Sequence, residues 1–169
     1  MCGYLAIVNA ATSIGLDPVL PLREEWKVSI SSTMVQSLLD SQSPLIKARV
    51  HILDGLSLCY PLPSVSEALL GPALPHIACR ESFSFVVNTA SGERIDDSNT
   101  NSHWIAVTFL PTPGGWATEI RCSLGLRKAE VEMAAEVLLQ SLIKLSSASP
   151  PFGENGSRTS SSSSDKLWQ

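Results

Sequence analysis

Two neighbouring segments alternate apolar and polar residues with the period of two that an extended strand requires. In the first segment, 103–110, the side chains of Ile105, Val107 and Phe109 fall on one side of the chain. In the second segment, 116–124, one side carries Trp116, Thr118, Ile120 and Cys122. A turn rich in proline and glycine separates the two. The pattern predicts an antiparallel hairpin that buries one face of a sheet.

The rest of the chain supplies further strands and several helices. Four segments have the composition of strands, namely 4–9, 47–53, 56–60 and 82–88. Asp54-Gly55 separates the second from the third and favours a tight hairpin, because both central positions of the preferred turn need a positive φ. Apolar residues recur at helical spacing in 31–41, 64–70 and 127–145. Pro44 and the pair Gly71-Pro72 are expected to end the first two of these helices.

These elements predict an α+β fold. The sheet is expected to be mostly antiparallel, with about five or six strands and with about two or three helices covering one of its faces. Composition changes after residue 145, because 146–169 contains five consecutive serines, Ser160–Ser164, and no periodic apolar pattern. Such a segment buries too little apolar surface to offset its ordering entropy. We therefore predict a single α+β domain over 1–145 and a disordered tail over 146–169, with candidate phosphorylation sites at 157–160 and 164–165.

Charge and cysteine content restrict the partners and the compartment. The net charge is −4 and the basic residues do not cluster, which argues against nucleic acid and against an anionic membrane surface as partners. The apolar run 4–8 is too short to span a bilayer, and no basic residue precedes it as in a signal peptide. The four cysteines form no Cys-x-x-Cys pair. We expect reduced thiols in a cytoplasmic or nuclear protein.

Met1-Cys2-Gly3 resembles the opening of the N-terminal-nucleophile glutamine amidotransferases. In that family the initiator methionine is removed, and the exposed cysteine attacks glutamine with its own α-amine as the base. The resemblance implies a nucleophilic role for Cys2. The Arg-Gly-Pro, Asn-Gly-Glu and Gly-Asp motifs of that family are absent from this sequence. The resemblance therefore implies no substrate pocket.

Ser102-His103-Trp104 opens an apolar strand and resembles the histidine motif of the ubiquitin-like-protein cysteine peptidases. In those enzymes the histidine is the general base for a thiol, and an aspartate on the next strand orients it. The next predicted strand here ends in Cys122-Ser123-Leu124, where the family has Asp-Ser-Leu. The family's nucleophile lies further downstream, whereas no cysteine follows Cys122. The resemblance therefore implies a degenerate or rearranged relative.

No metal or cofactor is expected. His76 and Cys79 have a short, ligand-like spacing, but structural zinc sites usually combine two such pairs. The sequence contains no glycine-rich phosphate loop and no Gly-x-Ser-x-Gly motif. The adjacent carboxylates at 96–97 diverge from one another, so they do not form a catalytic pair.

The absence of a coherent catalytic set in the sequence favours a non-catalytic subunit that binds another protein and helps to assemble a larger intracellular complex. Leu69 and Leu74 lie in a proline-rich stretch and are expected to form an exposed apolar patch. Leu167 and Trp168 end the polar tail, and tryptophan is enriched at binding hot spots. We predict that these four residues bind the partner.

The alternative is a Cys–His thiol hydrolase, resembling a cysteine peptidase or an amidotransferase with an N-terminal cysteine. His103 is then the base, and the nucleophile is Cys2, Cys59 or Cys79. A reactive thiol is exposed and ionises easily, whereas a buried structural thiol is inert, so cysteine reactivity separates the two hypotheses.

Overall fold

The structure is a computed structural model that describes residues 2–19, 31–53, 70–88, 103–123 and 129–148. The helices are α1 (Cys2–Ser13), α2 (Ser32–Asp40), α3 (Pro44–Arg49), the short 3-10 helix η3 (Gly71–Ala73), α5 (Leu74–Cys79) and α6 (Ala129–Ala148). The strands are β1 (Val50–Leu53), β2 (Phe83–Asn88), β3 (Trp104–Thr112) and β4 (Gly115–Cys122). The predicted α+β class is confirmed.

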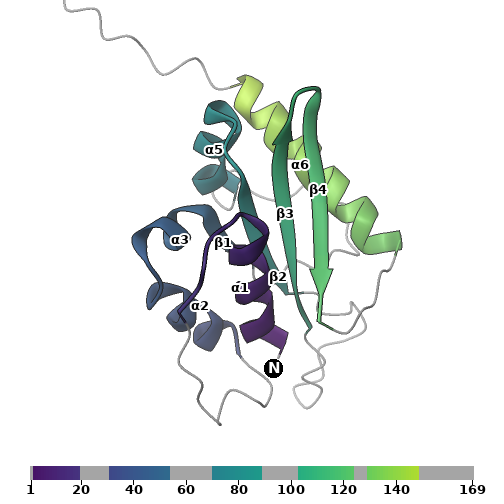
Figure 1. Cartoon of the computed structure of the whole chain (residues 1–169). Helices are drawn as coiled ribbons and strands as arrows, with labels where there is room; N and C mark the ends of the chain where they lie inside the picture. The colour runs from purple at the N-terminus through teal and green to yellow at the C-terminus, as the bar shows by residue number, and fades with distance from the viewer. Residues whose placement is uncertain (1, 20–30, 54–69, 89–102, 124–128, 149–169) are drawn as a thin grey trace, which may run out of the picture.

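The described strands form one mixed sheet in the order β1-β2-β3-β4 (Figure 1). The predicted hairpin of β3 and β4 is confirmed, with Ile105 opposite Cys122 and Thr112 opposite Gly115. The predicted strand at 82–88 is confirmed as β2, which pairs antiparallel with β3. The first strand, β1, pairs parallel with β2, so the sheet is mixed rather than purely antiparallel.

The sheet is covered on both faces, which corrects the prediction of one covered face. On one face lies the α1-side cluster of buried residues: Ala6, Ile7, Ala10, Ala11, Ile14, Val35, Leu38, Leu39, Ile46, Val50, Val86, Trp104 and Ala106. On the other face lies the α6-side cluster: Leu53, Leu70, Ala73, Phe83, Phe85, Val87, Ile105, Val107, Phe109, Ala135, Leu138, Leu139 and Leu142. Because successive side chains of a strand point to opposite faces, both clusters draw on β2 and β3, and all of β2 is buried.

The segment predicted as a strand at 4–9 is part of helix α1, so that prediction is wrong. Buried residues recur along it at helical spacing, at Ala6, Ile7, Ala10, Ala11 and Ile14. A short apolar run does not distinguish a buried strand from a buried helix by periodicity. The alanines present a small surface, which lets the helix axis lie close to the sheet.

Helix α2 confirms the helix predicted at 31–41, and Ser31 begins it by accepting a hydrogen bond from the backbone N–H of Met34. Pro44 was expected to follow a helix end, but it also occupies the first turn of α3, where its missing N–H has no intrahelical partner to lose. Ser43 caps α3 through the N–H of Ile46. As a result, residues 47–49 of the predicted strand 47–53 are helical, and only Val50–Leu53 is strand.

Several predictions fall partly outside the described residues. The turn Asp54-Gly55, the strand 56–60 and most of the helix 64–70 lie outside them. Gly71-Pro72 does not end the helical structure as predicted, because η3 and α5 follow it directly. The long helix predicted at 127–145 is confirmed as α6, but it continues to Ala148 and includes the first residues assigned to the tail.

A buried hydroxyl pair joins α1 to the sheet. The Ser84 hydroxyl donates to the Ala10 carbonyl at 3.0 Å and lies 2.7 Å from the Thr108 hydroxyl. Ala10 is in the last turn of α1, where carbonyl groups lack intrahelical partners. Ser84 and Thr108 are 0% and 1% exposed, so this contact fixes the helix on β2 and β3 without help from water.

Replacing Ser84 by alanine is expected to lower the free energy of unfolding by about 1–3 kcal/mol, because a buried carbonyl and a buried hydroxyl then lack a partner. Urea denaturation followed by circular dichroism measures the loss. Ser37→Ala is the matched control, since Ser37 is exposed on α2. Equal stability of the Ser84 and Ser37 variants would show that the buried contact is not needed to hold α1.

Candidate functional site

His103 and Cys122 meet at one end of the sheet. His103 directly precedes β3, and Cys122 is the last residue of β4. The Nε2 atom of His103 lies 2.9 Å from the Sγ atom of Cys122, and both residues are half-buried. The antiparallel pairing of β3 with β4 creates this contact, because it sets Ile105 opposite Cys122 and so places the start of one strand beside the end of the other.

Burial lowers the pKa of His103 below its ordinary value of 6.5. Desolvation is the cause, since removing water disfavours the charged imidazolium. The ring is therefore neutral at pH 7 and retains a nitrogen lone pair. A neutral imidazole in contact with a thiol is able to accept a proton from a nucleophile.

The start of α1 lies at the same end of the sheet. Figure 1 shows the N-terminal end of α1 beside the beginning of β3 and the end of β4. The contact of Ser84 with Ala10 holds the other end of the helix near the start of β2. The two cysteines lie on different faces, however. Cys122 packs against the α6-side cluster, so its contact with His103 lies on that face, whereas Trp104 and α1 contribute to the α1-side cluster. Cys2 opens α1 and is therefore at the same end of the sheet but on the opposite face, so the hypothesis that Cys2 serves His103 as nucleophile is not supported.

Cys79 lies at the opposite end. The guanidinium of its neighbour Arg80 donates to the carbonyls of Thr112 and Gly115, where the β3–β4 hairpin turns. Eight residue steps of β3 separate Trp104 from Thr112, and at about 3.3 Å per step this is roughly 25 Å. The hypothesis that Cys79 serves His103 as nucleophile is therefore not supported. Cys59 lies outside the described residues.

The His76–Cys79 pair has the wrong surroundings for a metal site. His76 Nε2 lies 2.7 Å from the Ala48 carbonyl, and its Nδ1 lies 3.3 Å from a carboxylate oxygen of Glu81. Both ring nitrogens thus already have protein partners. In the described part of the chain, no group of three or more histidine, cysteine or acidic residues is arranged to hold a metal ion.

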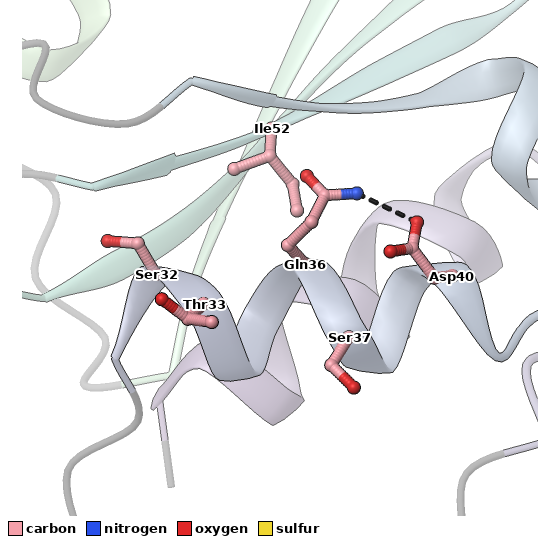
Figure 2. Close-up of a pocket in the computed structure, with 6 residues that line it drawn as sticks. All are labelled: Ser32, Thr33, Gln36, Ser37, Asp40 and Ile52. Carbon is pink, nitrogen blue, oxygen red and sulfur yellow. Dashed lines mark hydrogen bonds between the residues drawn. The ribbon is translucent and has the colours of Figure 1, made fainter.

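Away from His103, a hollow lies between α2 and the edge strand β1, with a volume of about 480 Å³. Figure 2 shows its lining: Ser32, Thr33, Gln36, Ser37, Asp40 and Ile52. The Gln36 amide donates to the Asp40 carboxylate at 2.9 Å, so the charge in the hollow is already hydrogen-bonded. None of these side chains is a thiol or an imidazole, so the hollow offers surface for binding but no nucleophile.

The four residues predicted to bind a partner are only partly described. Leu74 is half-buried and packs against the α6-side cluster, which leaves part of its side chain at the surface. Leu69, Leu167 and Trp168 lie outside the described residues. The role of these leucines and of Trp168 in partner binding stays a prediction.

Sequence reasoning missed the position of Cys2, because it assigned the segment after it to a strand. The available signal was the helical recurrence of small residues at Ala6 and Ala10 directly after Cys2-Gly3. A cysteine at the start of a helix is in a setting that favours the thiolate.

No family model matches the chain, and no curated protein or solved structure shows significant similarity to it. Among the described helices, none combines the length and apolar character needed to cross a bilayer. The functional argument therefore depends on the end of the sheet that carries His103.

Proposed function

We propose that this chain is a thiol-dependent acyl hydrolase in which His103 is the general base and Cys122 the nucleophile. The observation that carries the proposal is the 2.9 Å contact between His103 Nε2 and Cys122 Sγ at the end of the β3–β4 hairpin. This contact holds the imidazole beside the thiol on the α6-side face of the sheet. Hydrolysis by a cysteine requires such a base within hydrogen-bonding distance of the nucleophilic thiol.

The ring nitrogen that faces Cys122 is the one that takes the proton. Nε2 lies within hydrogen-bonding distance of the Cys122 thiol, so the neutral ring is placed to accept the thiol proton through this atom. Cys122 lies where the peptidases that the histidine motif resembles have the orienting aspartate, so the proposal gives this position a different role. The chain order, histidine before nucleophile, is the same as in those peptidases.

The chemistry follows from these roles. His103 accepts the thiol proton of Cys122 as sulfur attacks a carbonyl carbon, and the protonated ring then gives that proton to the leaving amine or alcohol. Water, deprotonated by the same ring, cleaves the acyl-thiol intermediate and regenerates the thiol.

Mapped alkylation of the cysteines tests this proposal. Iodoacetamide is applied briefly to the folded protein at pH 7, and mass spectrometry measures the label on each cysteine. Cys122 is expected to react at least tenfold faster than Cys79, which is exposed and therefore serves as an internal standard for an ordinary accessible thiol. Slower or equal labelling of Cys122 would contradict the proposal.

The second candidate is the non-catalytic assembly subunit in a cytoplasmic or nuclear complex. One observation favours it: His103 contacts a thiol at the position where an orienting carboxylate is expected. A thiol stabilises an imidazolium less well than a carboxylate does, so an ancestral activity could have been lost here. Co-purification from the native cells tests this candidate. A stoichiometric complex whose Cys122 labels no faster than Cys79 would favour the subunit over the hydrolase.

A further inference from the structure

We infer that His51 and His76 form a pH-sensitive contact that holds the edge strand β1 against α5 at neutral pH and releases it in acid. This histidine pair lies away from His103 and does not depend on the proposed hydrolase. His51 belongs to β1, and His76 belongs to α5. Their ring centroids are 5.5 Å apart, with the planes tilted by 35°.

Both ring nitrogens of His76 face hydrogen-bond acceptors. It is 8% exposed, and its Nε2 lies 2.7 Å from the Ala48 carbonyl, which only accepts hydrogen bonds. Its Nδ1 lies 3.3 Å from the Glu81 carboxylate, which also accepts when ionised. A neutral imidazole has one N–H and satisfies only one of these acceptors, whereas the imidazolium donates to both. Glu81 in turn contacts the Arg49 guanidinium at 3.4 Å.

His51 is arranged to stay neutral. Its Nε2 atom is buried and has no hydrogen-bond partner among the described residues. The neighbouring rings are those of His76 and Phe85, at centroid distances of 5.5 and 5.7 Å. No carboxylate in the described part of the chain contacts His51, so a proton on its ring would be both buried and close to the cation of His76.

The pKa of His51 is lowered from 6.5 to about 4, first by burial and second by the charge of His76. Since an unfolded or opened His51 binds its proton near pH 6.5, the open state binds more protons than the closed state between pH 6.5 and pH 4. The closed contact is therefore fully stable above pH 6.5 and loses stability as the pH falls toward 4.

The groups around the pair make the opening local. The charges that face it are those of Arg49 at the end of α3, His76 on α5 and Glu81 before β2. β1 has only four residues and pairs with β2 alone among the described strands. The adjacent residue Ile52 lines the hollow beside α2 (Figure 2), so release of β1 reshapes that hollow. Acid thus acts on one edge of the sheet and leaves the β3–β4 hairpin paired.

Hydrogen–deuterium exchange of the full chain at pH 7 and pH 5, corrected for intrinsic rates, tests the inference. The two limiting pKa values predict that protection of the amides of Val50–Leu53 falls about twentyfold between these pH values. Protection of Trp104–Thr112 is expected to change less than twofold. An equal loss in β3 would indicate global unfolding and would overturn the local contact.

Three variants make the result specific. His51→Phe removes the titrating group and keeps an aromatic ring beside Phe85, so the acid-dependent loss of protection in β1 should disappear. His51→Gln does the same without an aromatic ring, in case the phenylalanine does not fit. His103→Gln is the matched control. Burial lowers the pKa of His103 as well, but His103 precedes β3 and lies away from the His51–His76 pair. Acid sensitivity that persists in both His51 variants, or that disappears in His103→Gln, would refute the inference.

Discussion

His103→Gln is expected to slow the hydrolysis of p-nitrophenyl acetate by roughly a hundredfold or more, because general-base assistance contributes about 10²–10⁴ to such reactions. Glutamine keeps a polar side chain of similar reach but accepts no proton at neutral pH. Release of p-nitrophenol at pH 7 measures the rate, and circular dichroism verifies that the variant is folded. Cys122→Ser is expected to abolish the same activity.

The controls for this experiment follow from the structure. Cys79→Ser removes an exposed thiol at the far end of the sheet and should leave the rate unchanged. Full activity in His103→Gln would remove the base from the proposed mechanism. A loss of activity in Cys79→Ser equal to that in Cys122→Ser would instead assign the esterase activity to a thiol remote from His103.

The pH profile of the esterase activity should reflect the buried imidazole. The active form of His103 is neutral, and burial lowers its pKa below 6.5, so the rate is expected to persist on the acid side until the pH falls below that value. An ordinary exposed histidine would lose half of its base form at about pH 6.5. An acid limb centred above pH 6.5 would contradict the environment assigned to His103.

The second large effect is expected from Trp104→Ala, which should lower the free energy of unfolding by about 3–5 kcal/mol. Trp104 is 1% exposed and is the largest side chain in the α1-side cluster. Its removal leaves a cavity between β3 and the half of α1 that begins with Cys2, where Ala6 is too small to fill the space. Thermal or urea unfolding measures the loss.

Trp116→Ala is the matched control for this substitution. Trp116 is half-buried on β4 and meets Phe83 edge to face at a centroid distance of 5.8 Å. Removing it exposes apolar surface but opens no closed cavity, so a smaller loss of stability is expected. Because Trp104 directly follows His103, Trp104→Ala should also reduce the labelling of Cys122. Equal losses of stability in the two variants would argue against α1 being held mainly through Trp104.

The elements that the sequence predicts well are those with long, regular patterns. The alternation at Ile105, Val107 and Phe109 is confirmed as the α6-side face of β3, and α6 is confirmed by its helical recurrence of leucines. Ser31 is confirmed as the start of α2, because a serine before a helix has a local hydrogen-bonding role. These features depend on residues close together in the sequence, so a single chain contains the information.

The failures have a common physical cause. The run 4–8 has no polar face, and only contact with β2 and β3 selects a helix that buries Ala6 and Ala10. The same contact covers the second face of the sheet, which the alternation on β4 alone could not indicate. The sequence predicts that Pro44 ends a helix, but Pro44 begins α3 because Ser43 caps that helix.

The candidate site was partly accessible to sequence reasoning. A hairpin with a known turn places His103 near Cys122, and the structure gives that contact a distance of 2.9 Å. The face of the sheet that α1 and therefore Cys2 occupies was not accessible, because about a hundred residues separate Cys2 from His103 and no local pattern reports long-range packing. The His51–His76 pair is likewise a product of the parallel pairing of β1 with β2.

The sequence by itself determined the α+β class, the β3–β4 hairpin and the helix that covers one face, because periodic apolar residues must be buried on the side where they gather. Only the tertiary structure decided that α1 is a helix, that both faces of the sheet are covered, and which cysteines share an end with His103. The physical reason is that burial is a property of two surfaces in contact. A segment reveals its own apolar face, but the surface that covers this face comes from residues elsewhere in the chain.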